Sequence, residues 1–514
     1  IRRPPRSTRK ESSAASDVYK RQVLDPLLGL IKKGIDPSRS SVLRGTTGNI
    51  NVAAMSMLVK MPFVLYLINI SQKFWQKIVC GILIALTIFC LVFIASRASY
   101  VALIVIFLTY SFFYLYNYFI AKKSKHILLP ILYFVVPLVI SIGASKLIAD
   151  NINSTDFFER SASIVETVSD GSISKRLRFY AAGVDYMFSH PIFGSGIGNW
   201  KLISIFYEKE FMDSYIVPYH AHNDFIQIGG ELGIPGFLMY VGIFIMILAY
   251  FVFILKSKAS EKTNLFSILL FMSFSTYIID ALLNFPISRP ILQMAFILIG
   301  SLLIIILSNI NNHKYSHKSI FFKRNKMLLF VCLILLTPIT YISFLTFDSL
   351  KGQNTLIAEF NNGKLNYPLN KIEELVPKIP NISITTLPIS SMKARYYIEN
   401  GKPNEALDLL REDKKTNPYL GFNELLISQV FNTLNIKDSA VHYAKSAYEK
   451  LPIPPHFANY LKLLIEKKDT LEIDRIFIRD SAKHNTNVWR NYLVASNSLR
   501  PVGSIKTISI ANRA

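Results

Sequence analysis

Cysteine is scarce in this chain: the 514 residues hold three, and each lies inside an apolar run. Cys80, Cys90 and Cys332 are therefore predicted to be small packing residues, without a disulfide framework or a cysteine metal motif. Acidic side chains are also few, with 34 Asp and Glu against 57 Lys and Arg. The net charge of +23 would suit a nucleic-acid-binding protein, but many lysines stand in short loops between apolar runs, as orientation signals do. No nucleic-acid partner is therefore expected.

The first 22 residues lack the apolar core of a signal peptide. They are basic and rich in serine, and they resemble translated sequencing-adaptor read-through. We expect 1–22 to be non-native, so that the natural chain starts near Val23 with its N-terminus missing; a disordered basic tail is the alternative. Residues 23–35 fit the remnant of an earlier span or an interfacial helix. The tail 491–514 has no clear pattern.

Long apolar runs dominate the remainder, because 51% of the residues are hydrophobic and 13% are aromatic. Eight runs are each close to the roughly 20 residues that a helix needs to cross a bilayer. They predict an all-α, polytopic membrane domain over 23–348 with a long outer loop over 149–233. The predicted spans are 50–70, 78–95, 99–120, 127–148, 234–255, 265–284, 290–309 and 327–346.

Basic residues distinguish the two sides of these spans. They gather in four loops, and alternate counting of the spans puts all four loops on one side, which we assign to the cytoplasm. The other side then receives the loop 149–233, the turn 285–289 and everything after 347. The basic residues of the four loops are Lys73, Lys77, Lys122, Lys123, Lys125, Lys256, Lys258, Lys262, Lys314, Lys318, Lys323, Arg324 and Lys326.

The segment 350–490 is predicted to be a soluble helical-repeat domain. Five positions recur after 34 residues, which is the period of tetratricopeptide helical hairpins. Stacked hairpins form a concave surface, so the domain is expected to face a protein partner or a glycan. An ordinary helical domain with chance spacing is the alternative. The recurring pairs are Tyr397 and Phe431, Gly401 and Asn435, Ala406 and Ala440, Leu409 and Tyr443, and Pro418 and Pro452, with a degenerate third unit over 455–487.

The polar residues most suggestive of chemistry end the outer loop. His220, His222, Asn223 and Asp224 fall within five residues, beside a membrane-length apolar run. Ionisable groups are costly at a bilayer, so they predict a functional site. The two histidines would suit a metal only with further ligands, and no third ligand has convincing spacing. A histidine that acts as base or hydrogen-bond partner for a hydroxyl is favoured.

Arginines gather on the same outer side. Arg44 precedes the first span, Arg97 lies in a short turn, Arg176 and Arg178 start a predicted helix of the outer loop, and Arg289 lies in another turn. Arginine keeps its charge and offers forked donors that match phosphate oxygens. Since a positive-inside protein has few arginines here, the set indicates an anionic lipid phosphate or diphosphate. Snorkelling of each side chain to lipid headgroups is the alternative.

A glycine-rich turn follows in the outer loop, His190-Pro-Ile-Phe-Gly194-Ser-Gly196-Ile-Gly198. It does not open a helix within a strand–turn–helix unit, and it lies on the non-cytoplasmic side, where nucleotides are scarce. We therefore reject a nucleotide fingerprint. A tight turn that brings the backbone close to a ligand fits better.

The order of these motifs resembles the O-antigen ligase and polymerase superfamily, which also includes protein O-oligosaccharyltransferases. The resemblance covers about 40–310. Each motif is weak alone, but their order and common sidedness make the set fairly specific. The motifs are Arg44-Gly-Thr-Thr-Gly-Asn-Ile-Asn51, Ser96-Arg97, Arg176-Leu-Arg-Phe-Tyr180, His190-Pro-Ile-Phe-Gly194-Ser-Gly196, and His222-Asn223 followed after nine residues by Gly233-Ile-Pro-Gly236.

The resemblance implies transfer of a glycan from undecaprenyl diphosphate to an acceptor hydroxyl, outside the bacterial inner membrane and without metal or other cofactor. The acceptor is lipid A core for a ligase, another glycan for a polymerase, and Ser or Thr for an oligosaccharyltransferase. Carried over to this chain, Arg97 and Arg176 bind the diphosphate, and His222 acts on the acceptor hydroxyl. The further substrate-binding residues expected are Arg44, Arg178, His220, Asn223, Asp224 and Arg289.

The chain departs from the family pattern in two places. Members have roughly a dozen spans, so a loss of N-terminal spans is expected. Tyr180 stands where the family has tryptophan, which leaves the choice between Arg176 and Arg178 open. The spacing after His222 favours a ligase over a polymerase. A transporter would need ionisable residues inside the spans, where Asp280 is the lone buried acid expected. A scaffold would use the repeats but leave the outer arginines without a role.

Overall fold

The computed structural model describes residues 47–120, 128–151, 171–257, 259–312 and 318–480, together with Leu499. Arg44, the segments 1–22 and 23–35, and the tail 491–514 except Leu499 lie outside the described residues.

The described residues are helical throughout, apart from turns and one isolated bridge between Ile382 and Pro388. Eight helical segments among them are long and apolar enough to cross a membrane, the number that the sequence predicted. Large apolar side chains remain exposed along these segments, as a lipid-facing surface requires. The structure therefore confirms an all-α polytopic membrane protein. The segments are Ile50–Ile70, Phe74–Ile94, Arg97–Phe119, Leu128–Leu147, Asp224–Lys256, Glu261–Leu283, Pro290–Ile310 and Lys326–Asn362.

The chain divides into two compact units, each assembled from separate parts of the sequence. Unit 1 holds the residues up to Ile197 and His220–Ser316, and unit 2 holds Gly198–Tyr219 and the residues from His317 onward. The segment that precedes His220 in the outer loop thus folds with the C-terminal part of the chain.

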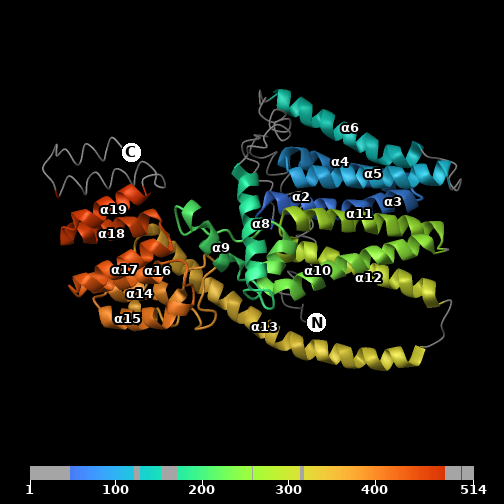
Figure 1. Cartoon of the computed structure of the whole chain (residues 1–514). Helices are drawn as coiled ribbons and strands as arrows, with labels where there is room; N and C mark the ends of the chain where they lie inside the picture. Colours follow the sequence, from blue (N-terminus) through green and yellow to red (C-terminus); the bar gives the residue numbers. More distant parts are fainter. Residues whose placement is uncertain are drawn as a thin grey trace, which may run out of the picture. The chain divides into compact units, whose positions relative to one another are not determined.

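Unit 1 is a bundle of long helices, and α8 runs across one end of the bundle rather than along it (Figure 1). Its first span consists of two helices, α2 and α3. Pro62 is the second residue of α3, a position in the first turn where the missing N–H of proline is tolerated. The helices are α2 (Ile50–Leu58), α3 (Met61–Ile70), α4 (Phe74–Ile94), α5 (Arg97–Phe119), α6 (Leu128–Asn151), α8 (Gly171–Ser189), α10 (Asp224–Lys256), α11 (Glu261–Leu283) and α12 (Pro290–Asn312), with a short 3-10 turn, η3 (Pro286–Ser288).

Side-chain contacts fix the direction of the central helices. The Tyr114 hydroxyl, near the end of α5, donates to Asn69 Oδ1 at the end of α3 over 2.9 Å. Tyr66 of α3 packs on Phe266, near the start of α11, with ring centroids 4.8 Å apart. Helix α5 therefore ends, and α11 begins, at the end of the bundle where α3 ends.

Helix α10 runs antiparallel to α11. Phe251 of α10 packs on Phe271 at 5.3 Å, and Phe244 packs on Tyr277 at 6.2 Å. The starts of α5 and α10 and the turn 284–289 therefore lie at one end of the bundle, which we call the outer end.

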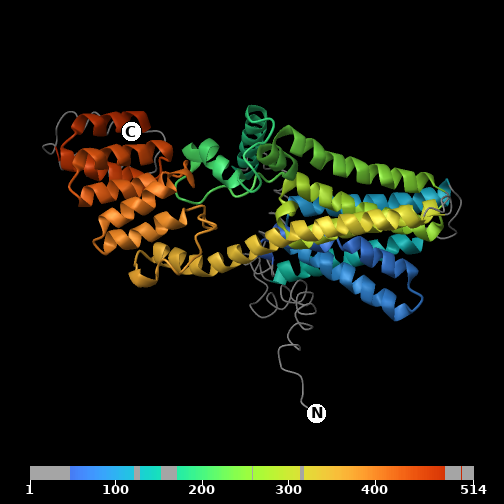
Figure 2. The same ribbon diagram turned by 90° about the horizontal axis from the view of Figure 1, so that it is seen from below.

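The described part of unit 2 contains three helical hairpins, drawn from orange to red in Figures 1 and 2. Two residues that the predicted repeat aligns, Gly401 and Asn435, both adopt a left-handed backbone at the turns of the first two hairpins, with φ of 71° and 59°. Ala406 and Ala440, also aligned, are fully buried where helices cross. The hairpins match the predicted spacing, and their assignment to the tetratricopeptide family stays a prediction. They are α14 (Ile389–Glu399) with α15 (Pro403–Glu412), α16 (Phe422–Thr433) with α17 (Lys437–Lys450), and α18 (Pro454–Lys467) with α19 (Thr470–Asp480).

Further described elements of unit 2 lie outside the hairpins. Helix α13 (Lys318–Asn362) is continuous, so the domain boundary predicted near 349 falls inside a helix. Helix α9 (Trp200–Glu208) and the 3-10 turn η2 (Lys209–Phe211) come from the outer loop. Ile205 of α9 is fully buried in the same apolar core as Leu356 of α13 and Met392 of α14.

Candidate functional site

The histidine segment enters the outer end of the bundle at the start of α10. Asn223 caps this helix, because its Oδ1 accepts the Ile226 N–H at 3.1 Å. One turn later, Gln227 accepts the Ala221 N–H at 3.1 Å and donates to Glu231 at 3.2 Å. The cap and the buried amide thus fix the backbone on both sides of His222.

His222 has a left-handed backbone, with φ of 58°, which is uncommon for a residue with a Cβ. The Tyr180 hydroxyl of α8 donates to the His222 carbonyl at 3.0 Å. Strained conformations of this kind persist only where the surroundings hold them, and they concentrate at functional sites. Tyr180 therefore has a structural role in presenting His222.

Aromatic rings surround the two histidines. The His220 ring stacks on Phe285 with centroids 4.1 Å apart, and the His222 ring meets the same Phe285 edge-on at 5.2 Å. Phe179 of α8 lies parallel to His222 at 6.5 Å. The Arg289 guanidinium lies 4.7 Å from the Phe285 ring centre. One phenyl ring in the turn between α11 and α12 thus gathers both histidines and an arginine.

The imidazole of His222 is electrically neutral at physiological pH. Burial lowers its pKa to about 4, and the positive charge of Arg176 acts in the same direction. Its Nδ1 is buried and has no hydrogen-bond partner among the residues that the structure describes. A neutral imidazole with a lone pair is a base, and the neighbouring Arg176 adds a positive charge for an anion.

Asp224 does not orient this imidazole. The carboxylate is fully buried, and its Oδ2 accepts the Ile287 N–H at 2.9 Å. It therefore fastens the turn between α11 and α12 to the start of α10. Asp280, also buried, accepts from the Asn284 amide at 2.7 Å, and its charge opposes the lowering of the Arg289 pKa by burial. The acids of the outer end thus hold the turn that carries Phe285 and Arg289.

The glycine-rich turn approaches the helix α10 itself. Gly233 has a non-helical backbone inside α10, and Pro235 has no N–H, so the carbonyls of Gly230 and Glu231 lose their usual donors. The N–H groups of Ser195 and Gly196 replace them, at 3.1 and 2.7 Å.

Hydrogen bonds between the glycine-rich turn and α10 run in both directions, because the Ile234 N–H of α10 donates to the Pro191 carbonyl at 2.8 Å. The two glycine motifs of the sequence are therefore two halves of one backbone junction between the outer loop and α10. The close approach of the two backbone segments accounts for the glycines at these positions without a bound ligand.

The remaining predicted site residues lie at different places. Arg97 is the first residue of α5, half-buried at the outer end. Arg178 is half-buried on α8, two residues beyond Arg176. The structure brings Arg176, His220, His222 and Arg289 together, and Arg97 lies at the same outer end of the bundle.

Sequence reasoning did not find three of the residues that build the site. No sequence feature marked Phe285 as a site residue, because aromatic residues are common in short turns. Gln227 and Glu231 stood in the histidine motif, and their spacing of four would have indicated a pair on one helical face. Among the described residues, no group of three His, Cys, Asp or Glu is arranged to hold a metal ion.

Two comparisons with known proteins bear on the chain. Residues 82–241 match the family model described as O-antigen ligase. The match begins in α4 and ends in α10, and it includes Arg97, Arg176 and His222. A search of curated proteins gave no match.

Proposed function

We propose that this chain, in which residues 82–241 match the O-antigen ligase family model, transfers a glycan from undecaprenyl diphosphate to the hydroxyl of lipid A core. The family match itself indicates glycan transfer of the ligase or polymerase type. The reaction would take place at the outer face of a bacterial inner membrane, without metal or nucleotide. The observation that carries the proposal is the environment of His222. Its imidazole is neutral, its backbone is strained, and it lies beside Arg176 just before a membrane span begins.

The arginines have the role of binding the diphosphate. As the bond between the anomeric carbon and the phosphate oxygen breaks, negative charge grows on that oxygen. A guanidinium already in place stabilises this charge, and one such contact is typically worth about 3 kcal/mol in the transition state. Arg176 has this role beside His222, and Arg97 has it at the same outer end of the bundle. Arg44, Arg178 and Arg289 are further substrate-binding residues in this proposal.

His222 is the base. The acceptor hydroxyl gives its proton to the imidazole while its oxygen forms the bond to the anomeric carbon, and the lipid diphosphate leaves with the electron pair of the broken bond. Attack opposite to the leaving group inverts the anomeric centre. General base catalysis of this kind typically contributes roughly 100- to 10,000-fold to the rate.

The same chemistry serves an O-antigen polymerase or a protein O-oligosaccharyltransferase, with another acceptor. The glycine spacing after His222 is the sequence feature that favours the ligase, and the same glycines form the backbone junction described above. An experiment that identifies the acceptor distinguishes the three activities.

Complementation of a strain that lacks its own O-antigen ligase tests the proposal. The wild-type chain is expected to restore lipopolysaccharide ladders on gels, and His222→Ala is expected to abolish them with membrane insertion unchanged. His442→Ala is the matched control, since His442 is exposed in unit 2 and far along the chain. Polymer that stays on the lipid carrier in the wild type would favour the polymerase, and a fully active His222→Ala protein would refute the role of His222.

A further inference from the structure

The outer-loop segment 198–219, which we call the anchored segment, folds into the core of unit 2. Ile205 is fully buried there, and Met212, Tyr215 and Val217 pack against the same core. Ser204 donates from its hydroxyl to the Pro218 carbonyl at 2.9 Å, which closes the segment on itself. The segment therefore folds as part of the helical hairpins, although the ligase family match contains it.

One side-chain hydrogen bond ties the anchored segment to the second and third hairpins. The fully buried His456 donates from Nδ1 to the Leu451 carbonyl at 2.7 Å, which leaves Nε2 as an acceptor. The Tyr215 hydroxyl donates to this Nε2 at 2.8 Å. Burial lowers the pKa of His456 to about 4, so the ring stays neutral and the donor–acceptor pattern is retained at physiological pH.

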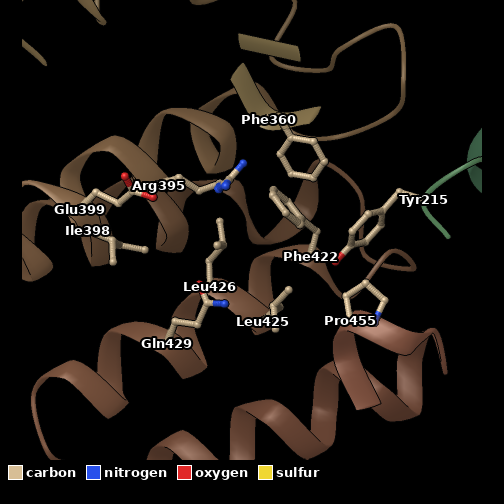
Figure 3. A pocket seen from close by; sticks show the side chains of 10 residues that line it. All are labelled: Tyr215, Phe360, Arg395, Ile398, Glu399, Phe422, Leu425, Leu426, Gln429 and Pro455. Carbon is tan, nitrogen blue, oxygen red and sulfur yellow. The ribbon is translucent and has the colours of Figure 1, made fainter. Parts of the chain in front are cut away.

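The ring of Tyr215 packs against aromatic neighbours and also lines a pocket. It meets Phe360 and Phe422 edge-on, at 6.3 and 5.4 Å, and Figure 3 shows the three rings along one wall of a pocket that Arg395 and Gln429 also line. The pocket has a volume of about 440 Å³. Since the ring also lines this pocket, the bond to His456 adds a directional contact that holds the Tyr215 hydroxyl in place.

The anchored segment is joined to unit 1 by peptide bonds at both ends. Gly198 follows Ile197, and Tyr219 precedes His220. Tyr215 is seven residues before His222, so the bond to His456 restricts the chain that leads directly into the proposed base.

We propose that Tyr215 and His456 are positioning residues for glycan transfer: their hydrogen bond holds the anchored segment in the helical hairpins and thereby presents His222 to the acceptor. The proposal rests on the proposed function, and it gives the hairpin unit a role in the chemistry. Accurate placement of a base is a large part of its effect, and small displacements reduce the rate strongly.

The test uses the full-length chain in nanodiscs with Tyr215→Phe, which removes the hydroxyl and keeps the ring. Tyr460→Phe is the matched control, because Tyr460 is buried in the same unit and its hydroxyl binds Glu472 at 3.1 Å, away from the anchored segment. Limited trypsin digestion reports opening of the segment through cleavage after Lys201 and Lys209. Transfer from a lipid-linked glycan to lipid A core gives kcat and KM.

In Tyr215→Phe, His456 Nε2 loses its donor, so cleavage in the segment is expected to rise about tenfold. The kcat is expected to fall about tenfold with the KM for the lipid-linked donor unchanged, since the arginines that bind the diphosphate are untouched. Tyr460→Phe is expected to change neither quantity.

Unchanged cleavage in Tyr215→Phe would overturn the anchoring. Raised cleavage with an unchanged kcat, in a preparation whose wild type transfers glycan, would overturn the positioning role. If the wild type transfers nothing, the proposed function fails and the positioning role with it, while the digestion still decides the anchoring.

Discussion

At the scale of single residues, the proposed transfer depends on the protonation state of the His222 imidazole. His222 packs against Phe179 and Phe285, and Arg176 is near enough to disfavour a second positive charge. Both influences keep the ring neutral, which is the form that accepts a proton. The surroundings of the proposed base therefore hold it in the form that its proposed role requires.

The pH dependence of transfer follows from this environment. A pKa near 4 keeps about nine-tenths of His222 neutral at pH 5, whereas a histidine with an ordinary pKa of about 6.5 would be mostly protonated there. Transfer by the wild type is expected to stay nearly constant from pH 7 to pH 5 and to halve near pH 4. Initial rates in buffered nanodiscs measure it.

Arg176→Gln removes one of the two causes that lower the pKa of His222, so this pKa is expected to rise. The residual activity of the variant is therefore expected to fall off at a higher pH than that of the wild type as the medium is acidified. A wild-type profile that halves near pH 6.5 would contradict the neutral, buried histidine.

Tyr180 provides a second test at this scale. Tyr180→Phe removes the hydroxyl that donates to the His222 carbonyl, so the strained backbone loses a support. Transfer is expected to fall about two- to tenfold, as for the loss of one neutral hydrogen bond. Tyr341→Phe, at an exposed tyrosine of α13, is the control and is expected to be silent. Equal activity of both variants would remove Tyr180 from the account.

The sequence indicated several site residues because charge at a bilayer edge is rare. His220, His222, Arg176 and Arg289 could be named for that reason, and the structure gathers them. The phenyl ring that gathers them could not be named, since Phe285 is one of 36 phenylalanines and its role arises only from the packing of α11 against α12.

At the scale of elements, the junction between the outer loop and α10 is the feature that the hydropathy pattern missed. The predicted span began at 234, because glycine and proline at 233–236 are typical of a helix break. The helix begins ten residues earlier, at Asp224, because the N–H groups of Ser195 and Gly196 supply the hydrogen bonds that the kink removes. By contrast, Pro290–Ile310 matches its predicted span closely, since no outside group is needed there.

Gly194 of the junction and Gly198, four residues later, form a matched pair for mutation. Gly194 and Gly198 both have a positive φ, at 57° and 76°, so alanine strains the backbone at either position. A Cβ at Gly194 would lie 2.5 Å from the carbonyl carbon of Glu231, whereas nothing lies within 4 Å of one at Gly198. Gly198→Ala is expected to lower the free energy of unfolding by about 1 kcal/mol, and Gly194→Ala by clearly more.

Thermal unfolding of the two variants in detergent measures the difference. Equal melting temperatures would show that the close contact at Glu231 does not form.

At the scale of the whole molecule, we predict that the chain is organised by sidedness. The sequence places the lysine-bearing loops between alternate spans, and Arg97, His222 and Arg289 at the other ends. The sequence could predict this pattern, since charge placement and span count are both readable along the chain. It could not predict that 198–219 belongs to the C-terminal unit, because that grouping depends on tertiary packing of Ile205 and Tyr215.

Labelling with a membrane-impermeant maleimide tests the proposed orientation. In a background without Cys80, Cys90 and Cys332, Lys462→Cys in unit 2 is expected to react in intact spheroplasts. Gln72→Cys, exposed between α3 and α4, is expected to react only after lysis. The reverse result would place the hairpins in the cytoplasm and exclude extracytoplasmic transfer.

The most direct measurement of the central claim is transfer by the purified full-length protein. The assay combines an undecaprenyl-diphosphate-linked glycan with lipid A core in nanodiscs containing EDTA and no nucleotide. The account predicts glycosylated lipid A core from the wild type and from His442→Ala, and a rate at least 100-fold lower from His222→Ala with the fold intact. Equal rates from the wild type and His222→Ala would contradict it.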